Sequence, residues 1–320
     1  MKGEKQMPKI LITPKSFQKY KEKPIEMLTA MGYEVIENTT GKTLTEEQLL
    51  SYINQDIIGI IVGVDPLTEE VLQKFPSLKA ISKYGVGMDN IDLQAAAALG
   101  IKVGNAKDTN NISVCELALA LMFECARKLS SAIKGVKDFG WDRSIGIELT
   151  GKHLLIVGGG KIGKEVTKRA KGLAMEVTIY DPYMRDEEFL QAHQIGYATD
   201  FAEIIQQVDI VSLHLPATPE TKHLMNATVF EKMKPSAMLI NTARGELVDE
   251  QALLSALVQG QIAIAAQDVY SVEPPEVGDA LVQLDNFILT PHIGAYTEEA
   301  VERMAIVSTQ NILNLLNEQG

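Results

Sequence analysis

Apolar residues in the first third of the chain form short runs that alternate with amphipathic stretches. The runs at 9–12, 34–36, 57–62, 78–82 and 101–103 predict strands, and the segments 24–31, 45–53, 68–75 and 92–99 predict helices. The run 57–62 is apolar throughout, which indicates a strand buried on both faces. Five strands with intervening helices predict a doubly wound, parallel α/β sheet.

The pattern changes after residue 105. The residues from Asn110 to Ser113 introduce a predicted helix that runs to Arg127, and Glu116 stands three positions after Ser113, as in a capping box. A helix this apolar requires burial on most of its sides. A less regular stretch, which contains Trp141, then extends to Thr150.

A second alternating series begins at Gly151. Its predicted strands are 153–157, 176–180, 209–213, 238–241, 263–267 and 287–289, a count that matches a six-stranded dinucleotide fold. The final segment, 297–316, predicts one amphipathic helix that returns to pack on the first domain. A chain of 320 residues is long for one core, and two domains are expected.

A glycine-rich turn follows the strand 153–157. Gly158, Gly160 and Gly163 have the G-x-G-x-x-G spacing, in which the glycines make a tight turn, admit a pyrophosphate and let helix and strand pack closely. The N–H groups at the helix start then meet the phosphate charge. Asp181 ends the next strand, where a carboxylate can accept both ribose hydroxyls of NAD and would repel the extra phosphate of NADP. The alternative is a glycine turn of another α/β protein, with Asp181 as a helix cap.

Charge and composition exclude several classes of function. A net charge of −12 without a run of Lys or Arg argues against nucleic-acid and acidic-membrane surfaces. The first residues lack the apolar stretch of a signal peptide, and the run 117–123 is too short to span a membrane. Cys115 and Cys125 fall about 15 Å apart on one predicted helix, too far for a disulfide, so free thiols in a reducing cytoplasm are expected. No metal site is expected.

Three side chains that can carry chemistry follow strands of the second series. Arg244 follows 238–241, Glu273 comes shortly after 263–267, and His292 follows 287–289. Ligands bind beyond the carboxyl ends of strands in open α/β sheets, so the three are expected at one edge. Arginine forms a planar fork for a carboxylate, and histidine can supply a proton near neutral pH. A glutamate bonded to that histidine would orient its ring and favour its charged form. This set suits reduction of a keto acid. The alternatives are a surface ion pair for Arg244, a loop charge for Glu273 and a structural role for His292.

Longer motifs around these residues resemble the D-2-hydroxyacid dehydrogenase family. They are the glycine motif, Asn241-Thr242-Ala243-Arg244-Gly245, Asp268 with Glu273-Pro274, Thr290-Pro291-His292-Ile293-Gly294 and, in the first domain, the segment 85–92. The resemblance implies a Rossmann NAD-binding domain (105–295) inserted into a flavodoxin-like substrate domain (1–104 and 296–320).

The resemblance also implies roles for individual residues. Arg244 would clamp the substrate, His292 would act as acid and base, and Glu273 would support it. Substrate contacts would come from Arg244 and from the first domain at Tyr84, with the backbone of Val86 and Gly87 holding the carboxylate. The implied NAD contacts are Gly158, Gly160, Lys161, Ile162, Gly163, Asp181, Pro182, Leu215, Pro216, Thr242, Ala243, Asp268 and Gly294, with Asp268 near the nicotinamide.

The substrate would be a small anionic 2-hydroxy or 2-keto acid. Segments 82–87 and 105–107 are most similar to members that act on D-3-phosphoglycerate, which makes it the first candidate. Better-characterised members of that group carry an arginine for the phosphate after the third strand, where this chain has Gly63-Val64-Asp65-Pro66, and they often carry a C-terminal regulatory domain. A phosphate would need another partner, for which Lys83 and Lys107 are candidates. Glyoxylate and hydroxypyruvate are the alternatives.

Two other classes keep the same fold. A corepressor-like protein would use the NAD site while acting through a binding partner, and a degenerate structural relative would bind the cofactor without turnover. The intact Arg–Glu–His set favours an enzyme. The family likeness also implies a homodimer, formed through the helix at 113–127 and the segment that runs to Trp141.

Overall fold

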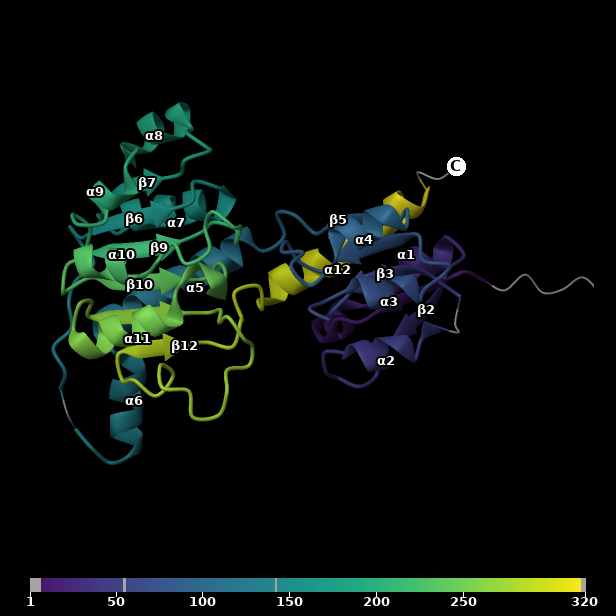
Figure 1. Cartoon of the computed structure of the whole chain (residues 1–320), viewed down its shortest axis with the longest axis horizontal. Helices are drawn as coiled ribbons and strands as arrows, with labels where there is room; N and C mark the ends of the chain where they lie inside the picture. Colours follow the sequence, from purple (N-terminus) through teal and green to yellow (C-terminus); the bar gives the residue numbers. More distant parts are fainter. Residues whose placement is uncertain (1–6, 54–55, 142, 318–320) are drawn as a thin grey trace, which may run out of the picture. The chain divides into compact units, whose positions relative to one another are not determined.

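The computed structural model describes residues 7–53, 56–141 and 143–317. The chain divides into two compact units, the first formed by 1–110 together with 295–320 and the second by 111–294 (Figure 1). Each has its own parallel sheet with flanking helices, so the predicted α/β fold class is confirmed. Within the described residues, no helix has the length and apolarity needed to cross a membrane.

The first unit is built on a five-stranded parallel sheet with the order β2-β1-β3-β4-β5. The strands are β1 (Lys9–Ile12), β2 (Glu34–Glu37), β3 (Ile57–Val62), β4 (Ala80–Lys83) and β5 (Lys102–Asn105). This is the flavodoxin-like order. The helices are η1 (Lys15–Tyr20), α1 (Glu22–Ala30), α2 (Glu46–Leu50), α3 (Glu69–Gln73), α4 (Leu93–Ala98) and α12 (Glu298–Asn317).

The C-terminal helix α12 completes the core of the first unit. Val301, Met304 and Ile312 are buried in one cluster with Ile10 and other residues of the sheet. The helix approaches β3 closely where the strand has Gly59, because a Cβ there would lie 3.2 Å from the Ile312 side chain. The apolar face of this C-terminal helix therefore covers strands formed by the N-terminal part of the chain.

The second unit is built on a seven-stranded parallel sheet with the order β12-β11-β10-β9-β6-β7-β8. The strands are β6 (His153–Val157), β7 (Glu176–Tyr180), β8 (Gly196–Ala198), β9 (Ile210–Leu213), β10 (Met238–Asn241), β11 (Ile264–Gln267) and β12 (Phe287–Leu289). In Figure 1 the labelled strands run down the sheet in the order β7, β6, β9, β10 and β12, and β11 lies between the last two. The order from β8 to β11 is the dinucleotide-binding order.

Both faces of this sheet are buried, which explains why residues 154–157 of β6 are all apolar. In β6, Leu155 and Val157 belong to one apolar cluster, and Leu154 and Ile156 belong to another. The helices that flank the sheet and its loops are α5 (Asn111–Arg127), α6 (Leu129–Lys137), α7 (Lys161–Gly172), α8 (Glu187–His193), α9 (Phe201–Ile204), α10 (Ala227–Lys232), η3 (Gly245–Leu247) and α11 (Glu250–Gln259).

Three predictions for this unit were wrong. The sheet has seven strands, not six, because the edge strand β8 is only three residues long and begins with Gly196, too short for an apolar run to reveal it. Helix α5 begins at Asn111, so Ser113 lies inside the helix and cannot form the predicted capping box with Glu116. The stretch after Arg127 contains helix α6, whose apolar residues at helical spacing are exposed.

Candidate functional site

The glycine turn after β6 has the geometry of a pyrophosphate cradle. Gly158 has φ +107°, and a Cβ there would lie 2.5 Å from the carbonyl oxygen of His214. A Cβ on Gly163 would lie 2.1 Å from the carbonyl oxygen of Gly158, so α7 can pack this closely only with glycine. Gly160 is the N-cap of α7, and a Cβ there would meet nothing within 4 Å. The turn is therefore unobstructed beside Gly160, at the positive N-terminal end of α7, where the pyrophosphate of a dinucleotide can bind.

Asp181, at the end of β7, is bonded to the glycine turn. Its Oδ2 accepts from the Gly159 N–H at 2.8 Å, and its Oδ1 accepts from the N–H groups of Tyr183 and Met184 at 2.9 and 3.0 Å. A carboxylate has about four lone-pair sites, so capacity remains for a ribose hydroxyl. Asp181 thus holds the glycine turn in place.

The remaining predicted cofactor contacts also follow strand ends. Lys161 and Ile162 form the first turn of α7, Pro182 follows β7, Leu215 and Pro216 come after β9, and Thr242 and Ala243 follow β10. Among the buried polar atoms of the described residues, Thr242 Oγ1 and His214 Nδ1 have no hydrogen-bond partner within the protein. Unsatisfied polar atoms at this edge fit a site that takes a polar ligand.

Asp268, which follows β11, holds the loop that carries His292. It is only 1% exposed. Its Oδ1 accepts hydrogen bonds from the Thr290 hydroxyl at 2.5 Å and from the Ile293 N–H at 2.9 Å. Its Oδ2 accepts a hydrogen bond from the Gly294 N–H at 2.7 Å. Burial raises the pKa of Asp268, although these three hydrogen bonds oppose the rise. His292 has φ +54°, a left-handed conformation that is uncommon outside glycine. Bonds on both sides of His292 keep the loop in that conformation.

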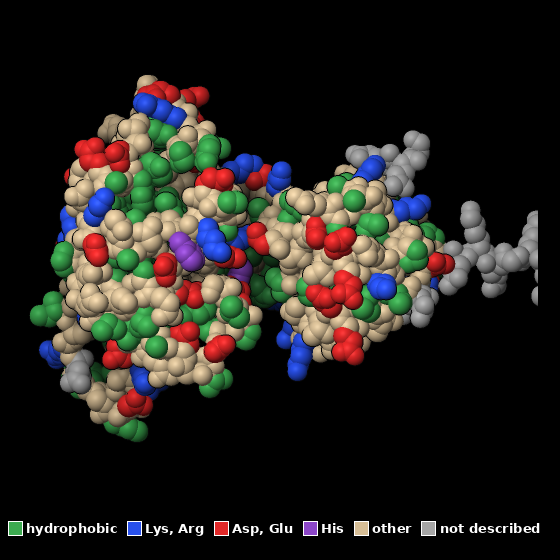
Figure 2. Space-filling model, viewed as in Figure 1, with side chains coloured by type: hydrophobic (Ala, Val, Ile, Leu, Met, Phe, Trp, Pro, Cys, Tyr) green, Lys and Arg blue, Asp and Glu red, His purple; other side chains and the backbone are tan. Residues whose placement is uncertain are grey.

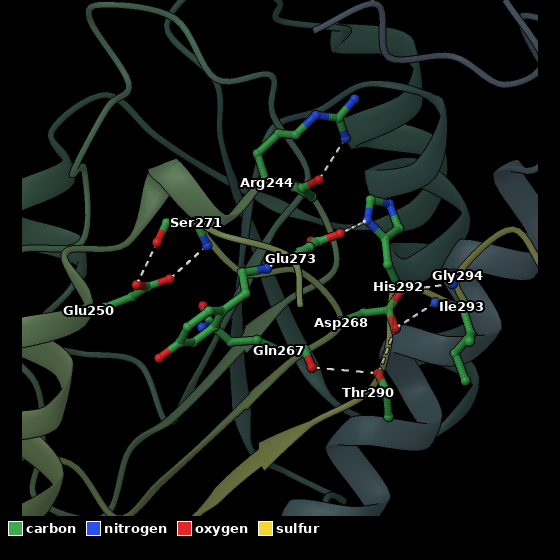
Figure 3. A network of polar contacts seen from close by, with 12 residues as sticks. Arg244, Glu250, Gln267, Asp268, Ser271, Glu273, Thr290, His292, Ile293 and Gly294 are labelled. Atoms are coloured by element: carbon green, nitrogen blue, oxygen red, sulfur yellow. Dashed lines mark hydrogen bonds and ion pairs between the residues drawn. The ribbon is translucent and has the colours of Figure 1, made fainter. Parts of the chain in front are cut away.

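Glu273 and His292 form the central pair of the site (Figure 3). His292 Nδ1 lies 2.8 Å from Glu273 Oε2, and Glu273 Oε1 accepts from the Tyr270 N–H at 2.9 Å. Partial burial alone would raise the pKa of Glu273, but the hydrogen bonds from His292 and Tyr270 and the nearby cations lower it. An ionised Glu273 accepts a hydrogen bond from Nδ1–H and fixes the ring, so Nε2 is the nitrogen that can exchange a proton with a ligand.

Arg244 comes from a third loop and lies beside this pair in Figure 3. Its positive charge contributes to the lowered pKa of Glu273, and its Nη1 donates to the Ala243 carbonyl at 2.7 Å. Asn241 Nδ2 donates to the Arg244 carbonyl at 2.8 Å and to Gln267 Oε1 at 3.1 Å, which secures the loop to the sheet. The structure therefore brings together the three side chains expected at this edge. The side chains of His292 and Glu273 are 47% and 38% exposed. In the space-filling view, histidine and charged side chains gather on the surface of the second unit (Figure 2).

Glu250, at the start of α11, supports the loop that carries Glu273. Its carboxylate accepts from the Ser271 N–H at 2.8 Å and from Ser271 Oγ at 2.6 Å. Gly245 packs against the same loop, since a Cβ there would lie 2.2 Å from the carbonyl carbon of Tyr270. The roles of Glu250, Ser271 and Thr290 were not predicted from the sequence. The only signals were a polar residue at a helix start, Glu250, and one directly after a strand, Thr290; Ser271 gave none.

The predicted substrate contacts of the first unit lie at the end of β4 and in the loop that follows it. Tyr84 is buried, and its hydroxyl donates to the Val301 carbonyl at 3.1 Å, so its side chain belongs to the core. Val86 is exposed, and its carbonyl accepts from Asn105 Nδ2 at 2.6 Å. Gly87 follows in the same loop, where its backbone is partly exposed.

Lys83 and Asp65 are both buried beside that loop. Lys83 Nζ donates to Asn90 Oδ1 at 2.8 Å and to the Gly63 carbonyl. The Asp65 carboxylate accepts from the Leu44 N–H at 2.6 Å and from the Thr13 hydroxyl. The Lys83 bonds join the loops that follow β3 and β4, and the Asp65 bonds join the loop after β3 to those after β1 and β2. Both charged groups are therefore engaged within the first unit.

Comparison with known proteins places this arrangement in a family. Residues 119–294 match the family described as D-isomer specific 2-hydroxyacid dehydrogenase, NAD binding domain. A D-3-phosphoglycerate dehydrogenase of Methanocaldococcus jannaschii is 40% identical over 312 residues, which are 97% of this chain and 58% of that protein. A hydroxypyruvate reductase of Thermotoga maritima is 38% identical over 290 residues, covering 89% of this chain and 93% of that protein. A solved Thermus thermophilus structure has a TM-score of 0.86 and 33% identity, covering 97% of both chains.

The chain therefore belongs to the D-isomer specific 2-hydroxyacid dehydrogenase family, and its second unit contains the family's Rossmann-type NAD-binding domain. The predicted family, fold class and cofactor are confirmed. The chain spans about half the length of the first curated phosphoglycerate dehydrogenases that it matches, 58%, 55% and 48% of three of them.

Proposed function

We propose that this protein is an NAD-dependent dehydrogenase that interconverts a small D-2-hydroxy acid and its 2-keto acid. The observation that carries the proposal is the 2.8 Å contact between His292 and Glu273, at a strand edge shared with Arg244. An imidazole paired with a carboxylate, next to a guanidinium, is the set needed to protonate an alkoxide and hold a carboxylate. No group of acidic, histidine or cysteine side chains able to hold a metal is found among the described residues.

The bound cofactor would be held by the glycine turn, Asp181 and the loops after β9, β10 and β11, and NADH would supply the hydride. Arg244 would bind the substrate carboxylate and polarise its ketone. His292, oriented by its bond to Glu273, would donate the Nε2 proton to the oxygen as it becomes a hydroxyl. In the oxidative direction the neutral imidazole would accept that proton. Asp268 would keep the His292 loop in register beside the nicotinamide.

We propose that residues 1–104 and 296–320, which lie within the first unit, form a substrate domain that is discontinuous in sequence. Residues 105–295, which include the whole second unit, would form the cofactor domain. The backbone N–H groups of Val86 and Gly87 would hold the substrate carboxylate. Tyr84 would support that loop from the core, because its hydroxyl is bonded to Val301.

D-3-phosphoglycerate is the first substrate to test, supported by the likeness to phosphoglycerate dehydrogenases of several organisms. Hydroxypyruvate or glyoxylate is the second candidate. It is favoured by the loop 63–66, which has no cation, and by the internal hydrogen bonds of Lys83 and Asp65. A relative named glyoxylate reductase, from Thermococcus litoralis, is 35% identical over 316 residues.

A panel of 2-keto acids assayed by NADH absorbance tests the proposal. Phosphohydroxypyruvate, hydroxypyruvate, glyoxylate and pyruvate should separate the candidates, and turnover of at least one is expected. NADH binding without turnover of any of them would overturn the dehydrogenase and favour the corepressor-like alternative.

We also propose a homodimer in the cytoplasm. The residues after α5 expose apolar side chains, among them Ile133 (55% exposed), Val136 (53%) and Trp141 (74%). Exposed apolar surface of this kind marks an interaction site. Cys115 and Cys125 are free and buried, as expected for a reducing compartment.

A further inference from the structure

The peptide between Val86 and Gly87 has a fixed orientation in the first unit. The Val86 carbonyl accepts from Asn105 Nδ2 at 2.6 Å, and the peptide is trans. In a trans peptide the C=O of one residue and the N–H of the next point in opposite directions. The bond to Asn105 therefore turns the Gly87 N–H away from Asn105.

The N–H groups of this loop are available to a ligand. Over the described residues, no acceptor within the protein is found for the N–H groups of Val86 and Gly87. Val86 is 40% exposed, so the loop is accessible from solvent. Two consecutive unpaired N–H groups form the kind of concave donor set that binds an anion.

Asn105 is itself held by two elements of the unit. It ends β5, where it lies opposite Lys83 in the register with β4, and the Ala106 N–H donates to the Gly85 carbonyl at 2.9 Å. Its own carbonyl accepts from Asn311 Nδ2, on α12, at 2.8 Å. The carboxamide of Asn105 is thus presented to the Val86 carbonyl by main-chain contacts that do not depend on its side chain.

We propose that Asn105 is a positioning residue for the substrate carboxylate, because it holds the Val86–Gly87 peptide with its N–H toward the ligand. The inference rests on the proposed function. The neutral carboxamide of Asn105 fixes the peptide without placing a second charge beside the substrate carboxylate. A peptide that was free to turn could instead present its carbonyl oxygen, which repels an anion. Without the Asn105 donor, carboxylate binding weakens while hydride transfer in the bound complex is retained.

The test is Asn105→Ala in the full-length protein, with NADH and the keto acid that the panel identifies. We expect KM for the keto acid to rise about tenfold, the value of one lost hydrogen bond, with kcat and the Kd for NADH within twofold of wild type. The affinity of the NADH-loaded protein for oxalate, measured by calorimetry, should fall by the same factor. Asn105→Asp, which keeps the shape but loses the donor, should weaken oxalate binding further.

Asn314→Ala serves as the matched control, because Asn314 is exposed on α12 and its side chain is bonded to Gln310. It should leave KM, kcat and the affinities for NADH and oxalate unchanged. Unchanged KM and oxalate affinity in Asn105→Ala would overturn the inference while leaving the proposed function intact. A parallel fall in NADH affinity and melting temperature would also overturn it, since it would indicate a purely structural role. A wild-type protein that reduces none of the keto acids would instead overturn the proposed function, and with it this inference.

Discussion

At the level of single residues, the proton donor depends on the carboxylate behind it. Because the pKa of Glu273 lies below its ordinary value, this group is charged at neutral pH and accepts a charge-assisted hydrogen bond from His292 Nδ1. Glu273→Gln removes that charge but keeps the shape. Keto-acid reduction needs an imidazole ring oriented with its Nε2 proton toward the substrate, so kcat at pH 7 should fall about 10²-fold. A kcat within twofold of wild type would contradict the supporting role of Glu273.

The guanidinium of Arg244 belongs to the same cluster, but its proposed role is to bind the substrate carboxylate. Arg244→Ala should lower kcat/KM for the keto acid by about 10²- to 10³-fold, since two charge-assisted hydrogen bonds are lost. NADH affinity, measured by fluorescence quenching, should change less than threefold. Arg244→Lys restores the charge without the planar fork and should recover only part of the activity. Near-normal turnover in the alanine variant would remove Arg244 from the site.

The residues of this cluster differ in how far the sequence could reveal them. Arg244, Glu273 and His292 could be predicted together because each follows a strand of a parallel sheet, and such ends share an edge. The internal bonds of Asp181 and Asp268 could not be predicted. They depend on backbone N–H groups whose direction is set only when neighbouring loops fold.

At the level of elements, the close packing of α7 against the end of β6 depends on the absence of a side chain at Gly163. A Cβ on Gly163 would lie 2.1 Å from the Gly158 carbonyl oxygen, and since both are backbone the helix would have to move. Gly163→Ala should therefore weaken NADH binding at least tenfold and lower the free energy of unfolding by about 1–3 kcal/mol. Calorimetry and urea titration measure the two effects.

Gly172→Ala, in the last turn of the same helix, is the matched control. A Cβ there would meet nothing within 4 Å, and alanine favours the helix by about 0.5–1 kcal/mol. This variant should bind NADH normally and unfold at equal or higher urea concentration. Equal losses in the two variants would mean that the close approach at Gly163 is unimportant.

Most strands and helices could be predicted from the hydrophobic pattern, because a buried parallel strand is almost wholly apolar. The hydrophobic pattern did not predict elements whose residues are not buried. Strand β8 is a short edge strand with partly exposed residues, and α6 exposes its apolar side chains. The start of α5 was missed because a serine inside a helix resembles a cap in sequence.

At the level of the whole molecule, the exposed apolar residues of α6 predict self-association. Ile133→Glu combined with Val136→Glu should convert a dimer into a monomer, since two charges would be buried in an apolar interface. Light scattering gives the mass directly. A wild-type monomer at micromolar concentration would contradict the proposed dimer.

The dependence of the first unit on α12 also has a consequence for biosynthesis. A ribosome makes strands β1–β5 early, but the helix that covers Ile10 and Ile61 emerges only after all of 111–294. The inserted unit can fold as soon as its last strand is complete, whereas its host must wait with an uncovered apolar sheet. Nascent chains halted near residue 294 should accordingly resist protease in the inserted part and recruit chaperones at the N-terminal strands.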